Sequence, residues 1–279
     1  MNTREILAKS FKSKLFLVLM IGLSVVCSGY IISALTSLTS GVGIIGLIFN
    51  ALFAIAPTIS VVCGWLLFGG KVSTGNIKGV KAYSSFQKVM TVIATVFVGI
   101  FCGIIFGLAV LLVVIASEAE EAIYGIVELA EELDVGADVF AELADAIVDG
   151  AIVFAVIIAI VIAIIMFVMI NLASTYKRIT KSFIRLAECY EDDNFNANRK
   201  IKFPIKRLWI FGVLYALTAI PTMLISVSAA IPSLGTATFF IACALWFNET
   251  NNALVANSVK VDEAPAEEAP AVEEAPAAE

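Results

Sequence analysis

Hydroxyl side chains recur at helical spacing beside a proline in one apolar stretch of the sequence. Thr218, Thr222 and Ser226 are four residues apart, so a helix places them on one face next to Pro221. Proline frees a backbone carbonyl, and free carbonyls together with hydroxyls build many transporter sites. The simpler interpretation is that each hydroxyl bonds a carbonyl of its own helix or a neighbouring helix.

A second apolar stretch carries Asn50 and Thr58 near Pro57. The amide of Asn50 is expected to bond across helices rather than to bind a solute. The full candidate solute path consists of Asn50, Pro57, Tyr215, Thr218, Pro221, Thr222 and Ser226. No Asp, Glu, Lys or Arg lies deep within an apolar stretch, which argues against proton coupling.

Acidic side chains gather in the segment 117–150, which holds 11 acidic residues and no basic one. Asp134, Asp138 and Glu142 are four apart, so like charges stack on one helix face unless something neutralises them. Together with Asp145 they form a candidate surface for divalent cations or for a basic partner. No EF-hand spacing is present, and a solvated acidic face is the alternative.

The residues required for most catalytic chemistry are missing from the sequence. The chain has no histidine, which removes the commonest general base and metal ligand. Its five cysteines are scattered without a C-x-x-C motif. Gly41, Gly43 and Gly46 spell G-x-G-x-x-G, but no strand or acidic ribose ligand accompanies them. We therefore expect no enzyme activity, cofactor, metal centre or nucleic-acid binding.

The composition is that of an integral membrane protein. Of 279 residues, 60% are hydrophobic and 15% are charged, and an average soluble domain carries about 25% charged residues. Six stretches are long enough to cross a bilayer as helices. They are 15–35, 42–68, 89–116, 147–173, 208–229 and 231–247, the last of which could instead be re-entrant. The expected fold is an all-α, six-helix transmembrane bundle.

Basic residues predict the direction of the spans. All 18 Lys and Arg residues fall in the N-terminus 1–14, the second and fourth connections and the C-terminal tail. The first, third and fifth connections have none. Because Lys and Arg mark the cytoplasmic side, both termini are predicted to be cytoplasmic, in a plasma or inner membrane.

Small residues recur every four positions in the third and fourth predicted spans. The two sets are Gly99, Gly103 and Gly107, and Ala151, Ala155, Ala159 and Ala163. Residues four apart share a helix face, and small side chains let helix backbones approach closely in lipid. We expect these two faces to meet each other, or to form the seam of a homo-oligomer.

The parts outside the predicted spans have distinct characters. The acidic connection, 117–146, shows apolar residues at helical spacing and predicts two short amphipathic helices with a hinge at 134–138. The fourth connection is expected to prolong the fourth helix to about residue 194. The tail, 248–279, repeats E-A-P-A three times, and this composition predicts disorder.

The sequence favours a non-catalytic protein that acts through interactions, as an assembly, regulatory or accessory subunit in the lipid bilayer. The small-residue ladders, the acidic connection and the tail support this interpretation. The alternative is a permease or exporter of a small solute, which depends on the prolines and the hydroxyl stripe.

Overall fold

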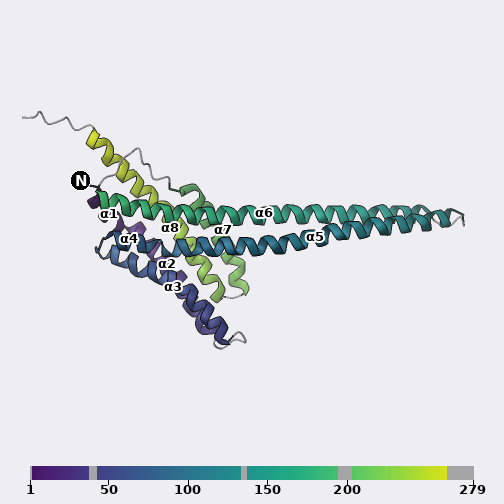
Figure 1. The fold of residues 1–279 in the computed structure, drawn as a ribbon, viewed down its shortest axis with the longest axis horizontal. Helices are drawn as coiled ribbons and strands as arrows, with labels where there is room; N and C mark the ends of the chain where they lie inside the picture. Colours follow the sequence, from purple (N-terminus) through teal and green to yellow (C-terminus); the bar gives the residue numbers. More distant parts are fainter. Residues whose placement is uncertain (1, 38–42, 133–136, 194–202, 226, 263–279) are drawn as a thin grey trace, which may run out of the picture. The chain divides into compact units, whose positions relative to one another are not determined.

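The computed structural model describes residues 2–37, 43–132, 137–193, 203–225 and 227–262, and within these ranges it contains helices and turns but no strand. Figure 1 shows the helices in chain order. Their bounds are α1 (Thr3–Phe11), α2 (Lys14–Ser37), α3 (Gly43–Phe68), α4 (Thr74–Val80), α5 (Ala82–Glu132), α6 (Ala137–Asp192), α7 (Ile205–Ile225) and α8 (Val227–Asp262). The predicted all-α class is confirmed for the described residues.

Six of the helices are long and apolar enough to cross a membrane, as predicted. They are α2, α3, α5, α6, α7 and α8. α7 ends at Ile225 and α8 begins at Val227, so the predicted boundary between the spans 208–229 and 231–247 falls inside α8. Pro232 falls inside α8, and the helix runs on from it to Asp262 without turning back.

The last turns of α8 occupy a stretch that was predicted to be disordered. The prediction placed the end of the sixth span at residue 247, yet the helix continues to Asp262. Thr250 and Leu254 are buried on this extension, and the Thr250 hydroxyl shares a hydrogen bond with the Ser10 hydroxyl of α1. Packing against α1 therefore supports a helix that composition alone did not indicate. Residues 263–279 lie outside the described part of the chain.

The chain divides into two compact units. Unit 1 consists of Met1–Tyr83 and Arg178–Glu279, and unit 2 consists of Ser84–Lys177. Unit 1 contains α2, α3, α7 and α8 with the short helices α1 and α4 and the last turns of α6. Unit 2 contains the greater part of α5 and α6.

Helix α8 is the central helix of unit 1, where it packs against α1, α2 and α7, while α2 also packs against α3. α2 and α8 are antiparallel. Phe16, near the start of α2, lies 5.1 Å between ring centroids from Trp246 near the end of the apolar part of α8. Gly29, near the end of α2, contacts Pro232 in the early turns of α8.

Two glycines bring the backbones of α2 and α8 together. A Cβ atom at Gly22 would lie 2.8 Å from the backbone nitrogen of Phe239. A Cβ atom at Gly235 would lie 2.7 Å from the backbone nitrogen of Val26. Side-chain Cβ atoms cannot approach backbone so closely without a shift, so this crossing requires glycine on both helices.

An aromatic cluster forms the core of unit 1 where α1, α2, α6 and α8 meet. The cluster is centred on Trp246, and the rings of Phe11, Phe16 and Phe183 lie 5.3, 5.1 and 5.9 Å from it between centroids. All four side chains are fully buried. The indole N–H of Trp246 donates to the Ser10 carbonyl at 3.0 Å, which satisfies the one polar atom of this side chain.

A buried polar cluster fixes the junction between α4 and α5. The Ser60 hydroxyl, on α3, donates to the Val80 carbonyl at 3.0 Å and accepts from the Tyr83 N–H at 2.7 Å. The Tyr83 hydroxyl lies 3.4 Å from the Thr236 hydroxyl of α8. Because Val80 is the last residue of α4, Ser60 satisfies a carbonyl that has no partner within that helix.

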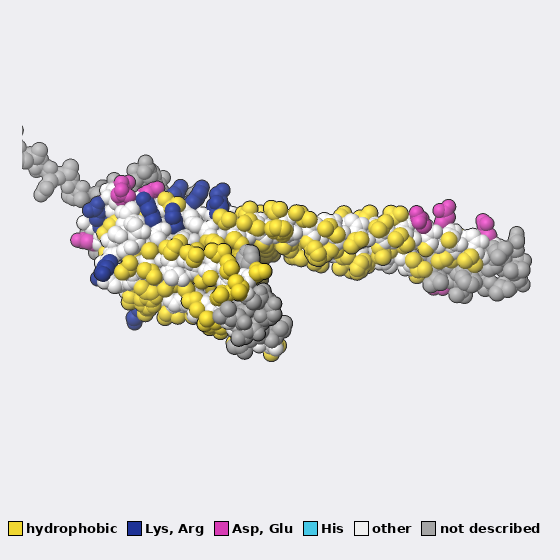
Figure 2. Space-filling view, turned by 60° about the horizontal axis from the view of Figure 1, so that its bottom comes forward, with side chains coloured by type: hydrophobic (Ala, Val, Ile, Leu, Met, Phe, Trp, Pro, Cys, Tyr) yellow, Lys and Arg dark blue, Asp and Glu magenta, His cyan; other side chains and the backbone are white. Residues whose placement is uncertain are grey.

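Unit 2 is an antiparallel pair of long helices (Figure 1). α5 has 51 residues and α6 has 56, so they measure about 77 and 84 Å at the usual rise of an α-helix. The less exposed positions are three or four residues apart, as in a coiled-coil seam. They include Val98, Cys102, Ile105 and Ala109 on α5 and Ala155, Ile158, Ile162 and Met166 on α6. Large apolar side chains cover the outside of the pair (Figure 2).

The acidic segment differs from the predicted pair of short helices. α5 continues without a break to Glu132 and α6 begins at Ala137, so both acidic stretches prolong the apolar helices. Buried or half-buried residues at 116, 123 and 127 continue the seam of α5 into this region, and this explains the continuity. The predicted hinge at 134–138 overlaps the interval between Glu132 and Ala137, and its residues 134–136 lie outside the described ranges.

Candidate interaction surfaces

The hydroxyls of the candidate solute path on α7 bond to their own helix. The Thr218 hydroxyl donates to the Tyr215 carbonyl at 3.0 Å, and the Thr222 hydroxyl donates to the Thr218 carbonyl at 2.6 Å. The Tyr215 ring stacks on Phe240 of α8, with centroids 5.7 Å apart. The hydroxyl protons of Thr218 and Thr222 thus bond to carbonyls of their own helix, as the simpler interpretation of the pattern expects. Pro221 is exposed within α7, and Ser226 lies outside the described residues.

The polar residues of α3 are arranged in the same way. Pro57 is buried inside this helix, and the neighbouring Thr58 hydroxyl donates to the Ala54 carbonyl at 2.7 Å. The Thr58 hydroxyl also lies 3.3 Å from the Cys27 sulfur of α2. The side chain of Asn50 is not described. Apart from Ser226, the residues proposed as a solute path occupy two different helices, α3 and α7.

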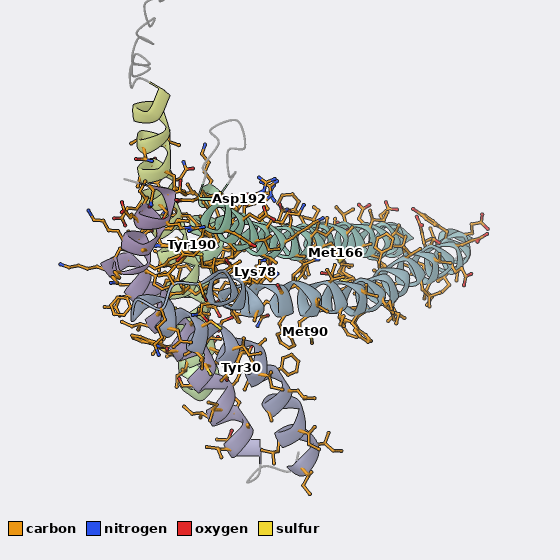
Figure 3. All side chains as sticks on the ribbon, turned by 60° about the vertical axis from the view of Figure 1, so that its left-hand side comes forward. Tyr30, Lys78, Met90, Met166, Tyr190 and Asp192 are labelled. Carbon is orange, nitrogen blue, oxygen red and sulfur yellow. The ribbon has the colours of Figure 1, made fainter. Side chains whose placement is uncertain are left out.

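The glycine ladder of α5 is covered only at one end. Gly99 is half-buried, and a Cβ atom there would lie 3.4 Å from Cε of Met166, which Figure 3 shows on α6. At Gly103 and Gly107 none of the described residues comes within 4 Å of the Cβ position. The part of the ladder farther along α5 is an exposed strip of small residues between large apolar side chains.

The alanine ladder of α6 faces α5 at one end and becomes exposed toward its other end. Ala151 is buried, Ala155 and Ala159 are half-buried, and Ala163 is exposed. A step of four residues rotates by about 40° around a helix, whereas alternating steps of three and four stay on one side. Because α5 and α6 pack with the second spacing, a strict four-residue ladder faces the other helix over only part of its length.

The acidic ends of α5 and α6, residues 117–132 and 137–149, which we call the acidic extension, are joined by a side-chain contact between described residues. The Tyr124 hydroxyl donates to Oδ1 of Asp145 at 2.7 Å, which joins α5 to α6 beyond the apolar stretch. This hydrogen bond raises the pKa of Tyr124, and partial burial and the negative charges of Asp145 and Glu120 act in the same direction.

The other candidate cation ligands do not converge within the described part of the chain. Glu142 and Asp145 are exposed on α6, Asp134 lies outside the described ranges, and the side chain of Asp138 is not described. No group of three or more acidic or cysteine side chains suited to a metal occurs among the described residues. The described residues of the acidic extension thus form a charged surface without a ligand geometry.

Basic side chains collect at one end of unit 1, which we call the basic end (Figure 2). It consists of α1, α4, the last turns of α6 and the last turns of α8, and its exposed basic residues include Arg4, Lys9, Lys12, Lys78, Lys181 and Arg185. The side chain of Lys78 and the carboxylate of Glu191 approach to 3.9 Å, and the Tyr190 hydroxyl donates to the Val72 carbonyl at 3.2 Å. These contacts join the end of α6 to the turn and helix that follow α3.

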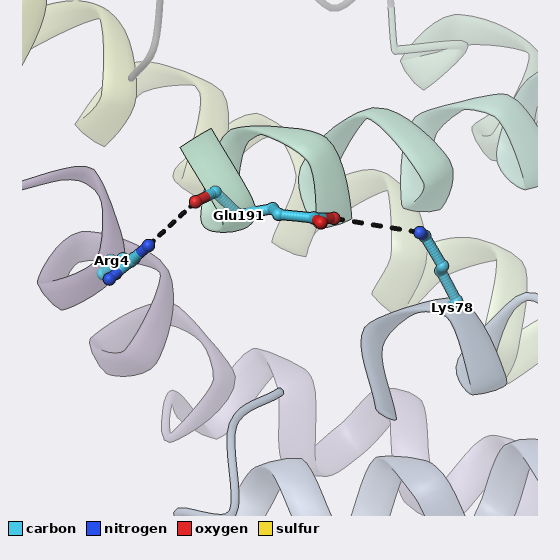
Figure 4. A network of polar contacts seen from close by, with 3 residues as sticks. All are labelled: Arg4, Lys78 and Glu191. Atoms are coloured by element: carbon cyan, nitrogen blue, oxygen red, sulfur yellow. Dashed lines mark hydrogen bonds and ion pairs between the residues drawn. The ribbon is translucent and has the colours of Figure 1, made fainter. Parts of the chain in front are cut away.

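Arg4 binds the carboxyl end of α6 (Figure 4). Its guanidinium donates to the Tyr190 carbonyl at 2.9 Å and to the Glu191 carbonyl at 2.8 Å. Its backbone N–H donates to the Asp193 carboxylate at 2.9 Å. The last carbonyls of a helix have no intrahelical partners and carry partial negative charge, so a guanidinium satisfies both needs. Sequence reasoning missed this role, although the capping pair Asn2 and Glu5 signals α1.

A groove of ≈ 540 Å³ lies between α1 and the last turns of α8 in the basic end. Lys9, Lys12 and Ser13 line it from the N-terminal side, and Glu249, Thr250 and Asn257 line it from α8. Among the described residues neither lysine forms an ion pair. The groove joins positions about 240 residues apart in the chain, so no local sequence pattern could have revealed it.

No family model, no curated protein and no solved structure matches this chain.

Proposed function

We propose that this chain is a non-catalytic, multi-pass membrane protein that acts by binding another membrane helix through the exposed small-residue strip of α5. The observation that carries the proposal is the open space at Gly103 and Gly107. Helix association in lipid depends on close backbone contact, and small residues permit it. The occupant would be a second copy of the chain or a helix of a partner protein.

The exposed apolar surface of unit 2 supports insertion in a bilayer. Of the residues in the most apolar stretches of the third and fourth spans, only 11% and 0%, respectively, are buried. Almost all of this surface therefore faces outward. A water-soluble protein could not expose it. The basic end of unit 1 supports cytoplasmic termini, because α1, α4 and the ends of α6 and α8 lie together there. We assign the acidic extension to the opposite side, and the membrane to the plasma or inner membrane.

Site-specific photo-cross-linking in native membranes tests the helix-binding surface. A photoreactive amino acid at Val110 lies on the same side as Gly103 and Gly107, because it is seven and three residues from them. Leu108 serves as the control position, because its side chain is even more exposed, at 60% against 45% for Val110. It points to another side of the helix. We expect a product of discrete mass from position 110 and none from position 108.

Substitution at the strip makes this test specific. Gly103→Leu should abolish the product from position 110, since a large side chain prevents close approach. Equal products from both positions, or a product that survives Gly103→Leu, would show that the strip faces lipid and would overturn the proposal.

A further inference from the structure

We propose that the groove between α1 and α8 binds the phosphate-bearing headgroup of an anionic phospholipid. This inference shares with the proposed function the insertion of the six apolar helices in a bilayer, but it concerns a different surface.

Both helices that form the groove place it directly beyond an apolar span. On the N-terminal side, the lining residues end at Ser13 and the apolar run of α2 begins at Leu15, after Lys14. On α8, Leu245 is the last exposed large apolar side chain among the described residues, and the lining begins at Glu249. Two separate helices thus set the groove at the level where a bilayer presents its headgroups.

The charges of the groove favour a phosphodiester with a net negative charge. Lys9 and Lys12 line the groove as exposed residues without a carboxylate partner among the described residues, and Glu249 contributes one negative charge. The Lys12 ammonium lies beside Gly70, and rotation of its flexible side chain brings it to a ligand in the groove. An ammonium is a strong point-charge donor to phosphate oxygens. The excess of one positive charge suits a headgroup with one negative charge better than a zwitterionic one.

Polar and apolar atoms of the groove match the other parts of a lipid headgroup. The Ser13 hydroxyl accepts the Phe16 N–H at 3.2 Å and keeps its own proton for a phosphate or glycerol oxygen. Asn257 adds amide donors and an acceptor on the α8 side. Ile6 and Ala253 form an apolar part of the wall, which suits the carbon atoms next to the ester linkages.

Native mass spectrometry of the purified full-length protein tests the site. The protein in mild detergent is titrated with phosphatidylglycerol, phosphatidylcholine or soluble glycerol 3-phosphate. We expect one preferred site for phosphatidylglycerol, and an affinity about 30-fold lower in Lys9→Gln/Lys12→Gln. Lys181→Gln/Arg185→Gln is the matched control, because it removes the same charge from exposed positions of the basic end outside the groove. We expect it to bind as the wild type does.

Glu249→Gln keeps the test decisive if the lysine variant folds poorly. Removing the one negative charge of the groove should strengthen binding of phosphatidylglycerol. Equal loss in the groove and control variants would indicate diffuse attraction to the whole basic end and would overturn the proposal. Binding of glycerol 3-phosphate as tight as that of the lipid would also overturn it. Neither result would alter the cross-linking at Val110, so the two proposals fail separately.

Discussion

The guanidinium of Arg4 takes two carbonyls at the end of α6 that have no helical partner. We expect Arg4→Ala to lower the free energy of unfolding by roughly 1–2 kcal/mol, a moderate value because the site is exposed. Thermal unfolding in detergent measures this change. The free energy of unfolding of Arg4→Lys should lie between those of the wild type and Arg4→Ala, since an ammonium keeps the charge but loses the fork geometry. An Arg4→Ala protein as stable as the wild type would show that these bonds contribute nothing.

Water access distinguishes a packed Thr222 from a solute path. Because the Thr222 hydroxyl bonds to its own helix, we expect Thr222→Cys, in a protein with the five native cysteines replaced, to resist a membrane-impermeant thiol reagent. The reagent is applied to intact cells and to inverted vesicles. Cysteines in the connections serve as controls for labelling. Reaction at Thr222→Cys from either side would make the permease the leading interpretation.

Tyr124 provides a pH-dependent contact in the acidic extension. Its raised pKa means that the hydrogen bond to Asp145 stabilises the folded state below the ordinary tyrosine pKa of about 10. This contribution is lost as the pH rises through the higher pKa of the folded protein. Asp145→Ala should lower the pKa of Tyr124, as followed by tyrosinate absorbance. Tyr124→Phe identifies the signal, and an unchanged titration in Asp145→Ala would contradict the assignment.

Between elements, the same residue type has opposite roles in α2 and α5. Gly22→Ala forces a Cβ atom against the backbone of α8 and should lower the free energy of unfolding by roughly 1–3 kcal/mol. Gly103→Ala meets none of the described residues and should raise stability by up to about 1 kcal/mol through helix propensity. Thermal unfolding in detergent compares the two variants. Equal effects would mean that α2 and α8 do not approach as closely as described.

The helices could be predicted from the sequence because length and hydropathy are local properties. The register between helices is not local, and it decides which glycines are covered. Gly22 and Gly235 lie at a backbone contact, while the more regular series that includes Gly103 faces outward. Likewise the sequence shows that Thr222 has a hydroxyl, but it does not show which of several nearby acceptors this hydroxyl bonds. The structure places the bond to the Thr218 carbonyl. The basic groove needed residues from both ends of the chain.

For the whole molecule, the distribution of basic residues predicts the orientation in the membrane. Glu142 and Lys181 are both exposed on α6, on either side of its apolar stretch. In the cysteine-replaced protein, we expect an impermeant reagent to label Glu142→Cys in intact cells and Lys181→Cys only in inverted vesicles. The reverse pattern would invert the topology. Labelling of both in intact cells would contradict the span between them.

Helix α5 passes unbroken from its apolar stretch into the acidic extension, so a tilt of the apolar stretch moves the acidic end with it. From Ala116 to Glu132 it extends about 24 Å, so a change in tilt of about 10° displaces its tip by about 4 Å. An apolar stretch longer than the bilayer core adjusts by tilting. A change in the thickness of the membrane would therefore change the position of the negative charges at the acidic end of α5.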